Sequence, residues 1–206
     1  MANISDASEI PELSDMSADS SIKTPRLLLQ CCCAPCASYV LEYLSPRYEI
    51  TALYYNPNIE PYEEYAKRGE ELQKLLSAAK YPNPVAILAP DYDNAAFKQA
   101  ASQYADEPEG GKRCAECFSI RLEKTAQLAS AGGYDCFATT LSVSPHKNAE
   151  LLNEIGDRLG AAYGVQHLRS NFKKNDGYKR SIELSKQYSL YRQLFCGCTS
   201  SRQRWI

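Results

Sequence analysis

Short apolar runs alternate with longer charged or amphipathic segments along most of this chain. The apolar runs have the length of buried strands and lie at 26–31, 48–55, 85–88, 134–139 and 165–168. The segments between and after them favour helices, at 37–44, 60–80, 92–104, 114–131, 147–163 and 178–191. Strands that alternate with helices of this length usually form a parallel sheet with helices on both faces. We therefore predict an α/β fold built on one Rossmann-like parallel sheet.

Residues 1–24 differ in composition from the rest of the chain. They are rich in Ser, Asp, Glu and Pro, carry five acidic residues against Lys23 alone, and show no apolar periodicity. We expect a disordered acidic tail here and a single folded domain over residues 25–206. The formal net charge of the whole chain is −2, and residues 25–206 hold 22 basic and 20 acidic residues. This balance argues against a general electrostatic affinity for nucleic acid.

The apolar runs are all too short to cross a membrane, since a spanning helix needs about 18 apolar residues in a row. The N-terminus also lacks the basic segment and apolar core of a secretory signal. We expect a cytoplasmic protein without a membrane partner. Nine cysteines is a high count for 206 residues. In a reducing cytosol, clustered cysteines more often bind metal or do redox chemistry than form structural disulfides.

Seven of the nine cysteines fall into three clusters, each at the end of a predicted element. They are Cys32, Cys33, Cys36, Cys114, Cys117, Cys196 and Cys198. At element ends the backbone can approach a ligand, and a helix N-terminus favours the thiolate that metals require. The other two, Cys31 and Cys136, lie inside apolar strands and are expected to pack in the core.

The number of clustered cysteines suggests two metal sites. A [4Fe–4S] cluster usually takes four thiolates, so three of the seven would remain for a second metal. Cys32 and Cys33 are adjacent, and neighbours in an extended segment point to opposite faces. We therefore expect these two to serve different metals. Spacing alone leaves three interpretations open: a structural zinc site, an iron–sulfur centre, and a redox-active pair of thiols.

The clusters belong to a longer series of motifs. In order, these are 32–36 (CCAPC), 54–59 (YYNPNI), 64–68 (EYAKR), 109–117 (EGGKRCAEC), 139–147 (TTLSVSPHK), 183–186 (ELSK) and 190–198 (LYRQLFCGC). In order and spacing the series resembles the QueH-type epoxyqueuosine reductases, over about residues 26–200. Two positions depart from the family pattern: Asn171 stands where an aspartate is expected, and Phe195 where a tyrosine is expected. The first change puts an acidic role at that position in doubt.

The resemblance implies a reaction, a substrate and a cofactor. Members of this family reduce the epoxide on the cyclopentane ring of epoxyqueuosine in the tRNA anticodon loop, which gives the alkene of queuosine and releases water. The resemblance also implies a [4Fe–4S] cluster beside a second, mononuclear iron, an external electron donor and no cobalamin. It further implies a fold like that of the nucleotide alpha-hydrolases, with residues 25–206 as the catalytic domain.

His146, Cys32 and Cys36 are the residues that we expect to act in catalysis. The unperturbed pKa of histidine lies near neutral pH, so His146 is the candidate proton donor. The alternative is a histidine that only binds backbone at a helix start. His167 has no motif around it and is expected to be structural. Polar side chains in the turns after strands are candidates to hold the modified base, although turn formation alone also explains the asparagines: Asn56, Asn58, Ser142 and Ser144.

A basic run with interleaved aromatic residues, at 172–180, is the clearest candidate for tRNA binding. Cations suit phosphate contacts, and aromatic rings suit stacking on unpaired bases. The candidates are Lys173, Lys174, Tyr178 and Arg180, with Arg68 and Arg113 as additions. A solvated charged face is the structural alternative. To reach a buried centre, the base has to be everted from the tRNA stack.

Two other functions compete with this interpretation. A tRNA sulfur-transfer enzyme would have a similar fold, but such enzymes usually cradle ATP with a glycine-containing loop after the first strand. Residues 32–36 contain no glycine. A zinc-stabilised RNA-binding module without enzymatic activity is the second alternative.

Overall fold

The computed structural model describes residues 23–199. Residues 1–22 and 200–206 lie outside the described part, so the predicted tail at 1–24 falls almost wholly outside it. None of the helices between residues 23 and 199 combines the length and the apolar character of a membrane span.

Five strands form one sheet with the order β3-β2-β1-β4-β5. The strands are β1 (Arg26–Gln30), β2 (Glu49–Leu53), β3 (Val85–Leu88), β4 (Cys136–Thr139) and β5 (Gln166–His167). Every neighbouring pair is parallel, and β1 is hydrogen-bonded to both β2 and β4. This confirms the predicted α/β fold with a parallel sheet. His167 lies in the edge strand β5.

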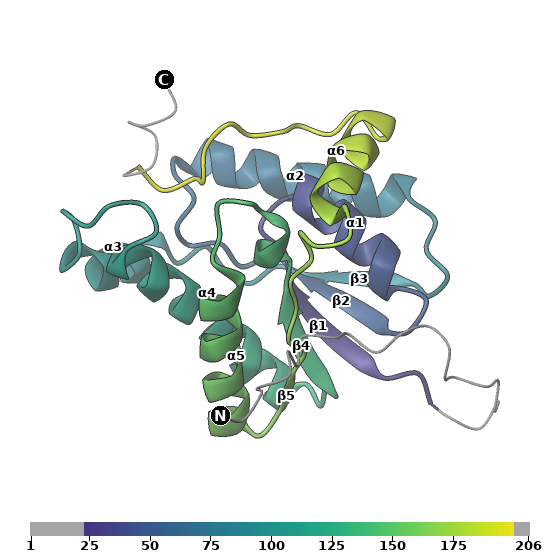
Figure 1. Ribbon diagram of the computed structural model, residues 1–206, viewed down its shortest axis with the longest axis horizontal. Coiled ribbons are helices and arrows are strands. Elements are labelled where there is room, and N and C mark those ends of the chain that lie inside the picture. Colours follow the sequence, from purple (N-terminus) through teal and green to yellow (C-terminus); the bar gives the residue numbers. More distant parts are fainter. Residues whose placement is uncertain (1–22, 200–206) are drawn as a thin grey trace, which may run out of the picture.

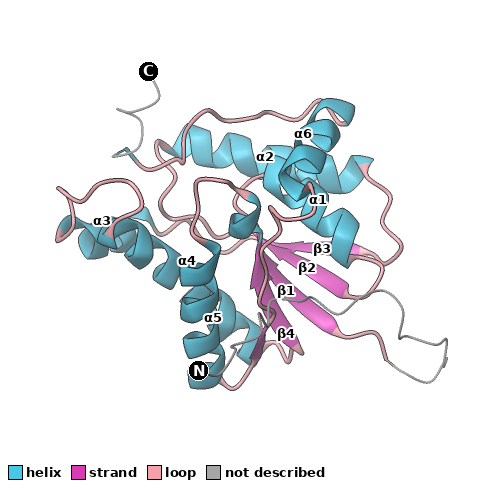
Figure 2. Ribbon diagram, viewed as in Figure 1, coloured by secondary structure: helices cyan, strands magenta, loops and turns pink. Residues whose placement is uncertain are grey.

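Helices cover both faces of the sheet (Figures 1 and 2). They are α1 (Ala34–Leu44), α2 (Tyr62–Ala78), α3 (Asn94–Ser102), α4 (Lys112–Ala131), α5 (Ala149–Tyr163) and α6 (Gly177–Gln187), with a short 3-10 helix, η1 (Thr140–Val143). Helices α1, α2 and α6 lie on one face, α4 and α5 lie on the other, and α3 packs beside α4. The 3-10 helix was not predicted, because a single turn has no periodicity to reveal it.

Consecutive leucines of β1 face the two sides of the sheet. Leu27 and Leu29 belong to the core formed with α1 and α2, whereas Leu28 belongs to the core formed with α4 and α5. All three are fully buried. The strand therefore reads as a continuous apolar run, as expected for a central strand that helices cover on both faces.

The strand order reverses between β1 and β4, because β2 and β3 lie on one side of β1 and β4 and β5 lie on the other. In such folds, a crevice forms between the loops that follow the two strands at this point, and ligands bind in it. The backbone N–H of Cys32, after β1, donates to Thr140 Oγ1, after β4, at 3.3 Å. The first cysteine cluster therefore stands at this crevice.

A buried polar network joins the carboxyl ends of the three central strands. Gln30 Nε2 donates to Asn56 Oδ1 at 3.1 Å and to the Tyr55 carbonyl at 3.2 Å, and Gln30 Oε1 accepts from Thr139 Oγ1 at 2.8 Å. Asn56 Nδ2 donates to the Cys31 carbonyl at 2.9 Å. Because β1 lies between β2 and β4, the network holds together the three loops that leave the sheet at this edge.

Two helix ends differ from the predicted ones in ways that affect the site. The helix expected from residue 147 begins at Ala149, because Asn148 caps it by accepting from two backbone N–H groups, so Lys147 lies in the preceding loop. The helix expected to reach residue 191 ends at Gln187. Residues 188–198 instead form an irregular segment, the C-terminal strap, which runs from α6 across α2 (Figure 1).

We expect Leu28→Ala to lower the free energy of unfolding by about 2–5 kcal/mol, because it opens a cavity between β1 and the helices α4 and α5. Denaturation in urea, followed by circular dichroism, measures the loss. Leu194→Ala is the matched control, since Leu194 is 77% exposed, and it should change stability by less than about 0.5 kcal/mol. Equal effects of the two substitutions would contradict this account of the core.

Candidate metal centre

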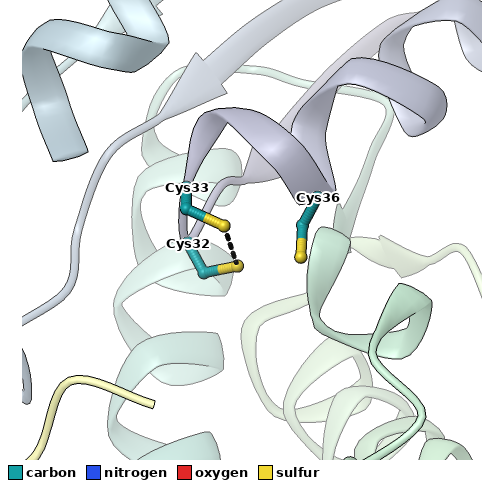
Figure 3. Close-up of side chains that lie close together, drawn as sticks. All are labelled: Cys32, Cys33 and Cys36. Atoms are coloured by element: carbon teal, nitrogen blue, oxygen red, sulfur yellow. Dashed lines mark hydrogen bonds between the residues drawn. The ribbon is translucent and has the colours of Figure 1, made fainter. Parts of the chain in front are cut away.

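Three thiols converge directly after β1 (Figure 3). The Sγ atoms of Cys32, Cys33 and Cys36 all lie within 4.8 Å of one another, and those of Cys32 and Cys33 are 3.6 Å apart. The expectation that Cys32 and Cys33 point to opposite faces is therefore wrong. That expectation assumed an extended segment, but β1 ends at Gln30 and the backbone bends at Cys32.

The local sequence explains how the three thiols meet. Cys33 is the N-cap residue of α1, in extended conformation, and Pro35 occupies the first turn, where its missing N–H costs little. Side chains on a helix lean toward its N-terminus, so Cys36 leans back over the two preceding thiols. The partial positive charge of the helix N-terminus favours thiolates at this position.

The three thiols are arranged to hold one negative charge in common. Hydrogen bonds with the Cys33 and Cys36 thiols hold the pKa of Cys32 well below its usual range. The hydrogen bond to Cys32 raises the pKa of Cys33 to about 12, and that of Cys36 is raised by the same neighbour. Cys32 is therefore the thiolate of the set. Cys31 and Cys136 are buried in the core, as predicted.

The second pair of cysteines lies in the first two turns of α4. Cys114 and Cys117 are 9% and 8% exposed. The backbone N–H of Gly110 donates to Cys114 Sγ at 3.2 Å, so the loop before α4 orients this thiol. Burial raises the pKa of Cys117 to about 12, Arg121 opposes this rise, and the thiols of the third cluster add to it. The second and third clusters therefore lie close enough to affect each other electrostatically.

The third cluster is carried by the C-terminal strap. Arg68, on α2, donates to the carbonyl oxygens of Cys196 at 3.1 Å and Phe195 at 3.2 Å. Gly197 has a φ of +117°, and a Cβ there would lie 2.9 Å from Ile59 Cγ1, so this position needs glycine. Arg68 was predicted to bind substrate, and its hydrogen bonds also hold the strap in place.

The first and third clusters border a cavity of about 260 Å³. Cys32 and Cys36 line it from the first cluster, and Cys196 lines it from the third. Further predicted residues line the same cavity: Asn58, Arg68, Ser144, His146 and Tyr178. The side chain of His146 is exposed, and its backbone N–H donates to Ser144 Oγ at 3.3 Å. The structure thus brings these residues together, while their individual roles stay predictions.

Three other predicted residues bind protein groups away from the cavity lining. Asn56 belongs to the polar network around Gln30. Ser142 Oγ is hydrogen-bonded to Ser170 Oγ at 3.2 Å and accepts from the Phe172 backbone at 3.3 Å. Arg113 Nη1 donates to three carbonyl oxygens of the loop before α4, the shortest at 2.7 Å. These contacts give all three residues a structural task.

The basic run at 172–180 is divided between core and surface. Phe172 is 2% exposed, so it cannot stack on a base, and this part of the expectation is wrong. Arg180 pairs with Glu42 of α1 at 2.9 Å and so joins α6 to α1. Lys173 Nζ donates to a backbone carbonyl at 2.6 Å, whereas Lys174 is exposed. The run therefore presents less free positive charge than its sequence suggests.

Two buried cations beside the thiols were missing from the predicted site. Lys147 Nζ lies 3.1 Å from Cys196 Sγ and 3.8 Å from Glu109 Oε1. Arg121 is 2% exposed, lies one turn after Cys117 on α4 and lines the cavity. Helical spacing could have identified Arg121, since residues four apart share a face of α4. No sequence signal shows that Lys147 turns toward Cys196.

Buried acceptors without hydrogen-bond partners line the cavity. Within residues 23–199, this holds for Asn58 Oδ1, Glu109 Oε1 and Gln193 Oε1. Gln193 Nε2 donates to Cys33 Sγ at 2.9 Å, so this side chain also orients a thiol. Thiolates are the ligands that zinc and iron–sulfur clusters select. The set of donor atoms therefore fits a thiolate-bound metal centre with a polar space beside it.

In the reduced protein without metal, we expect iodoacetamide to label Cys32 before Cys33 and Cys36, because the thiolate is the nucleophile. The lowered pKa of Cys32 keeps it ionised as pH falls below the usual thiol range, where the raised pKa values of the other two keep them protonated. Peptide mass spectrometry after brief labelling measures the order, with buried Cys136 as the unreactive control. Equal labelling of the three thiols would contradict this charge distribution.

Comparison with curated proteins gives a consistent set of relatives. The epoxyqueuosine reductase QueH of Streptococcus pyogenes serotype M1 is 44% identical over 176 residues, covering 84% of this chain and 69% of the relative. The same enzyme from Staphylococcus epidermidis is 41% identical, covering 84% and 75%. That of Thermotoga maritima is 35% identical, covering 85% and 89%.

The comparison with protein families agrees with these relatives. Among solved structures, a predicted subunit of tRNA methyltransferase from Methanocaldococcus jannaschii matches with a TM-score of 0.49 and 15% identity, covering 79% of this chain and 76% of the other. The family model described as "Epoxyqueuosine reductase QueH" matches residues 27–204, which include all nine cysteines. This chain belongs to the QueH family of epoxyqueuosine reductases.

Proposed function

We propose that this protein reduces the epoxide of epoxyqueuosine to the alkene of queuosine in the tRNA anticodon loop, on a cysteine-bound iron centre. The reaction consumes two electrons and two protons and releases the epoxide oxygen as water. The observation that carries the proposal is the cavity that Cys32, Cys36 and Cys196 line together, in a chain of this family. A tRNA substrate and reduced cysteines are consistent with a cytoplasmic enzyme.

The proposed centre is a [4Fe–4S] cluster with a second, mononuclear iron beside it, and it needs no cobalamin. The ligands would come from the seven clustered cysteines: Cys32, Cys33, Cys36, Cys114, Cys117, Cys196 and Cys198. When bound, the iron centre would supply the electrons, which an external donor must then replace. The three thiols after β1 are already close enough to share a metal.

The protein's own residues would hold the substrate and move protons. Asn58 Oδ1 and Gln193 Oε1 offer buried acceptors to hydroxyl or amine donors of the modified base. The imidazole of His146, at the cavity lining, would donate a proton to the departing oxygen. Ser144, which accepts from the His146 backbone N–H, would fix the turn that presents this ring.

Binding of tRNA would use the surface around the cavity. Tyr178 is 37% exposed and lines the cavity, so its ring is available to stack on a base at the entrance. Lys174 and Lys173 lie on the preceding loop and would contact phosphates. Because the cavity accepts a base and not a duplex, the modified nucleotide would have to be everted.

The competing functions predict different cofactors. A tRNA sulfur-transfer enzyme would bind ATP, whereas the N-terminus of α1 carries Cys33, Ala34, Pro35 and Cys36 in place of a glycine-containing phosphate loop. A zinc-stabilised RNA-binding module would yield colourless protein with zinc and no sulfide. Nothing specific in the cavity favours either over the reductase.

Anaerobically purified protein should contain about four to five irons per chain with acid-labile sulfide, and should show broad visible absorption, as expected for thiolate-ligated iron–sulfur centres. Elemental analysis and absorption spectroscopy measure this. One zinc per chain without sulfide is the result that would contradict the proposed centre.

Cys117→Ser should reduce conversion of epoxyqueuosine in tRNA by at least about 10-fold to 100-fold, because loss of a metal ligand costs at least as much as loss of a residue that hydrogen-bonds to a ligand. Mass spectrometry of nucleosides from the treated tRNA measures the product. Cys136→Ala, at a buried cysteine of the core outside the three clusters, is the control and should keep its activity. Full activity of Cys117→Ser would remove Cys117 from the proposed ligand set.

A further inference from the structure

Arg121 is a buried cation without a carboxylate partner. Its side chain is 2% exposed, and within residues 23–199 no acidic side chain lies within 4.0 Å of its guanidinium group. Its Nη2 donates to the neutral Asn56 Oδ1 at 2.6 Å, and its Nε is buried without a hydrogen-bond partner. A buried charge in this situation is costly unless something anionic lies beside it.

The groups beside Arg121 that can become anionic are thiols. It lies one turn after Cys117 on α4, and it lines the cavity that Cys32 and Cys196 also line. These three cysteines belong to the three different clusters. Asn56 is held by the polar network around Gln30, so the guanidinium is fixed at the point where the clusters meet.

Lys147 provides a second buried cation beside the strap. It is 9% exposed, and its Nζ lies 3.1 Å from Cys196 Sγ. The nearest carboxylate, Glu109 Oε1, is 3.8 Å away, beyond hydrogen-bonding distance. Lys147 also lines the cavity that Arg121, Cys32 and Cys36 line. Two fixed positive charges therefore face the same group of thiols.

An iron–sulfur centre held by thiolates is anionic, and each electron that it accepts adds to the negative charge. Its reduction potential depends on net charge, on hydrogen bonds to sulfur and on exposure to solvent. A buried cation nearby stabilises the reduced state more than the oxidised state, because Coulomb attraction grows with the charge and is weakly screened in the protein interior.

We infer that Arg121 and Lys147 raise the reduction potential of the iron centre and so let an external donor load it with electrons. The inference rests on the proposed function, because it requires the iron–sulfur centre. Both residues act here through the centre and not on the substrate. Their charge, and not only their hydrogen bonds, is the property that matters.

The test compares Arg121→Gln with Arg121→Lys in the loaded protein, by redox titration followed with absorption or EPR spectroscopy. At the midpoint potential of the wild type, Arg121→Gln should show a ratio of reduced to oxidised centre at least tenfold lower, a shift of about 59 mV for one electron. Arg121→Lys keeps the charge and should stay much closer to the wild type. Arg169→Gln removes an exposed arginine that is already paired with Glu150, and should leave the potential unchanged.

An unchanged potential in Arg121→Gln with full iron and sulfide content would overturn the inference, and so would an equal shift in Arg121→Lys. If Arg121→Gln does not retain the centre, the reduction potentials of Lys147→Gln and Lys147→Arg are compared in the same titration. Because only the second of these keeps the positive charge, equal potentials in the two variants would also overturn the inference. A wild-type protein with zinc and no sulfide would contradict the proposed function instead. The two failures are therefore distinguishable.

Discussion

The amide of Gln30 is the contact on which the arrangement of the site depends. It links the loop after β2, through Asn56, to the end of β4, through Thr139, from the last residue of the central strand. Its neighbour in the network, Asn56, continues to Arg121 on α4. The side chains of Gln30, Asn56 and Thr139 are 2% exposed or less, so their polar groups need hydrogen-bond partners within the protein. A network of this kind specifies one arrangement of the loops, since any other leaves buried groups unpaired.

The positions of the cysteine clusters follow from this arrangement of the loops. Cys32 follows the strand that carries Gln30, and its backbone binds Thr140, directly after Thr139. The second cluster lies on the helix that carries Arg121. The third is brought in by the C-terminal strap, which Arg68 holds through two carbonyl oxygens. The three cysteine clusters, from remote parts of the chain, therefore lie near one another because a polar network and one arginine hold the segments that carry them.

The charges at the site are divided between buried thiols and buried cations. Thiols gathered in a buried place are hard to ionise, as the raised pKa of Cys117 shows. Arg121 and Lys147 oppose this, and the helix N-terminus at Cys33 adds a further favourable field. A site built for neutral ligands would have no use for two buried cations. The proposed anionic iron centre gives both of them a counter-charge.

The sequence by itself determined the alternation of strands and helices, the core cysteines Cys31 and Cys136, and the three clusters that carry the chemistry. These features depend on local composition and short-range spacing, which periodicity and motif order reveal directly. The family was also recognisable, because its motifs keep their order along the chain.

Only the tertiary structure decided which side chains face one another. The bend after β1 brings Cys32 and Cys33 to the same side, against the rule for extended chain. Packing buried Phe172, which a basic aromatic run had marked as a contact for RNA. Arg121 and Lys147 reach the thiols through helix position and a capped helix start. The bend after β1 and the spacing of Arg121 from Cys117 are local features of the chain. The burial of Phe172, the contact of Lys147 with Cys196 and the approach of Arg121 to Cys32 and Cys196 depend on contacts between segments far apart in the chain, which local sequence does not show.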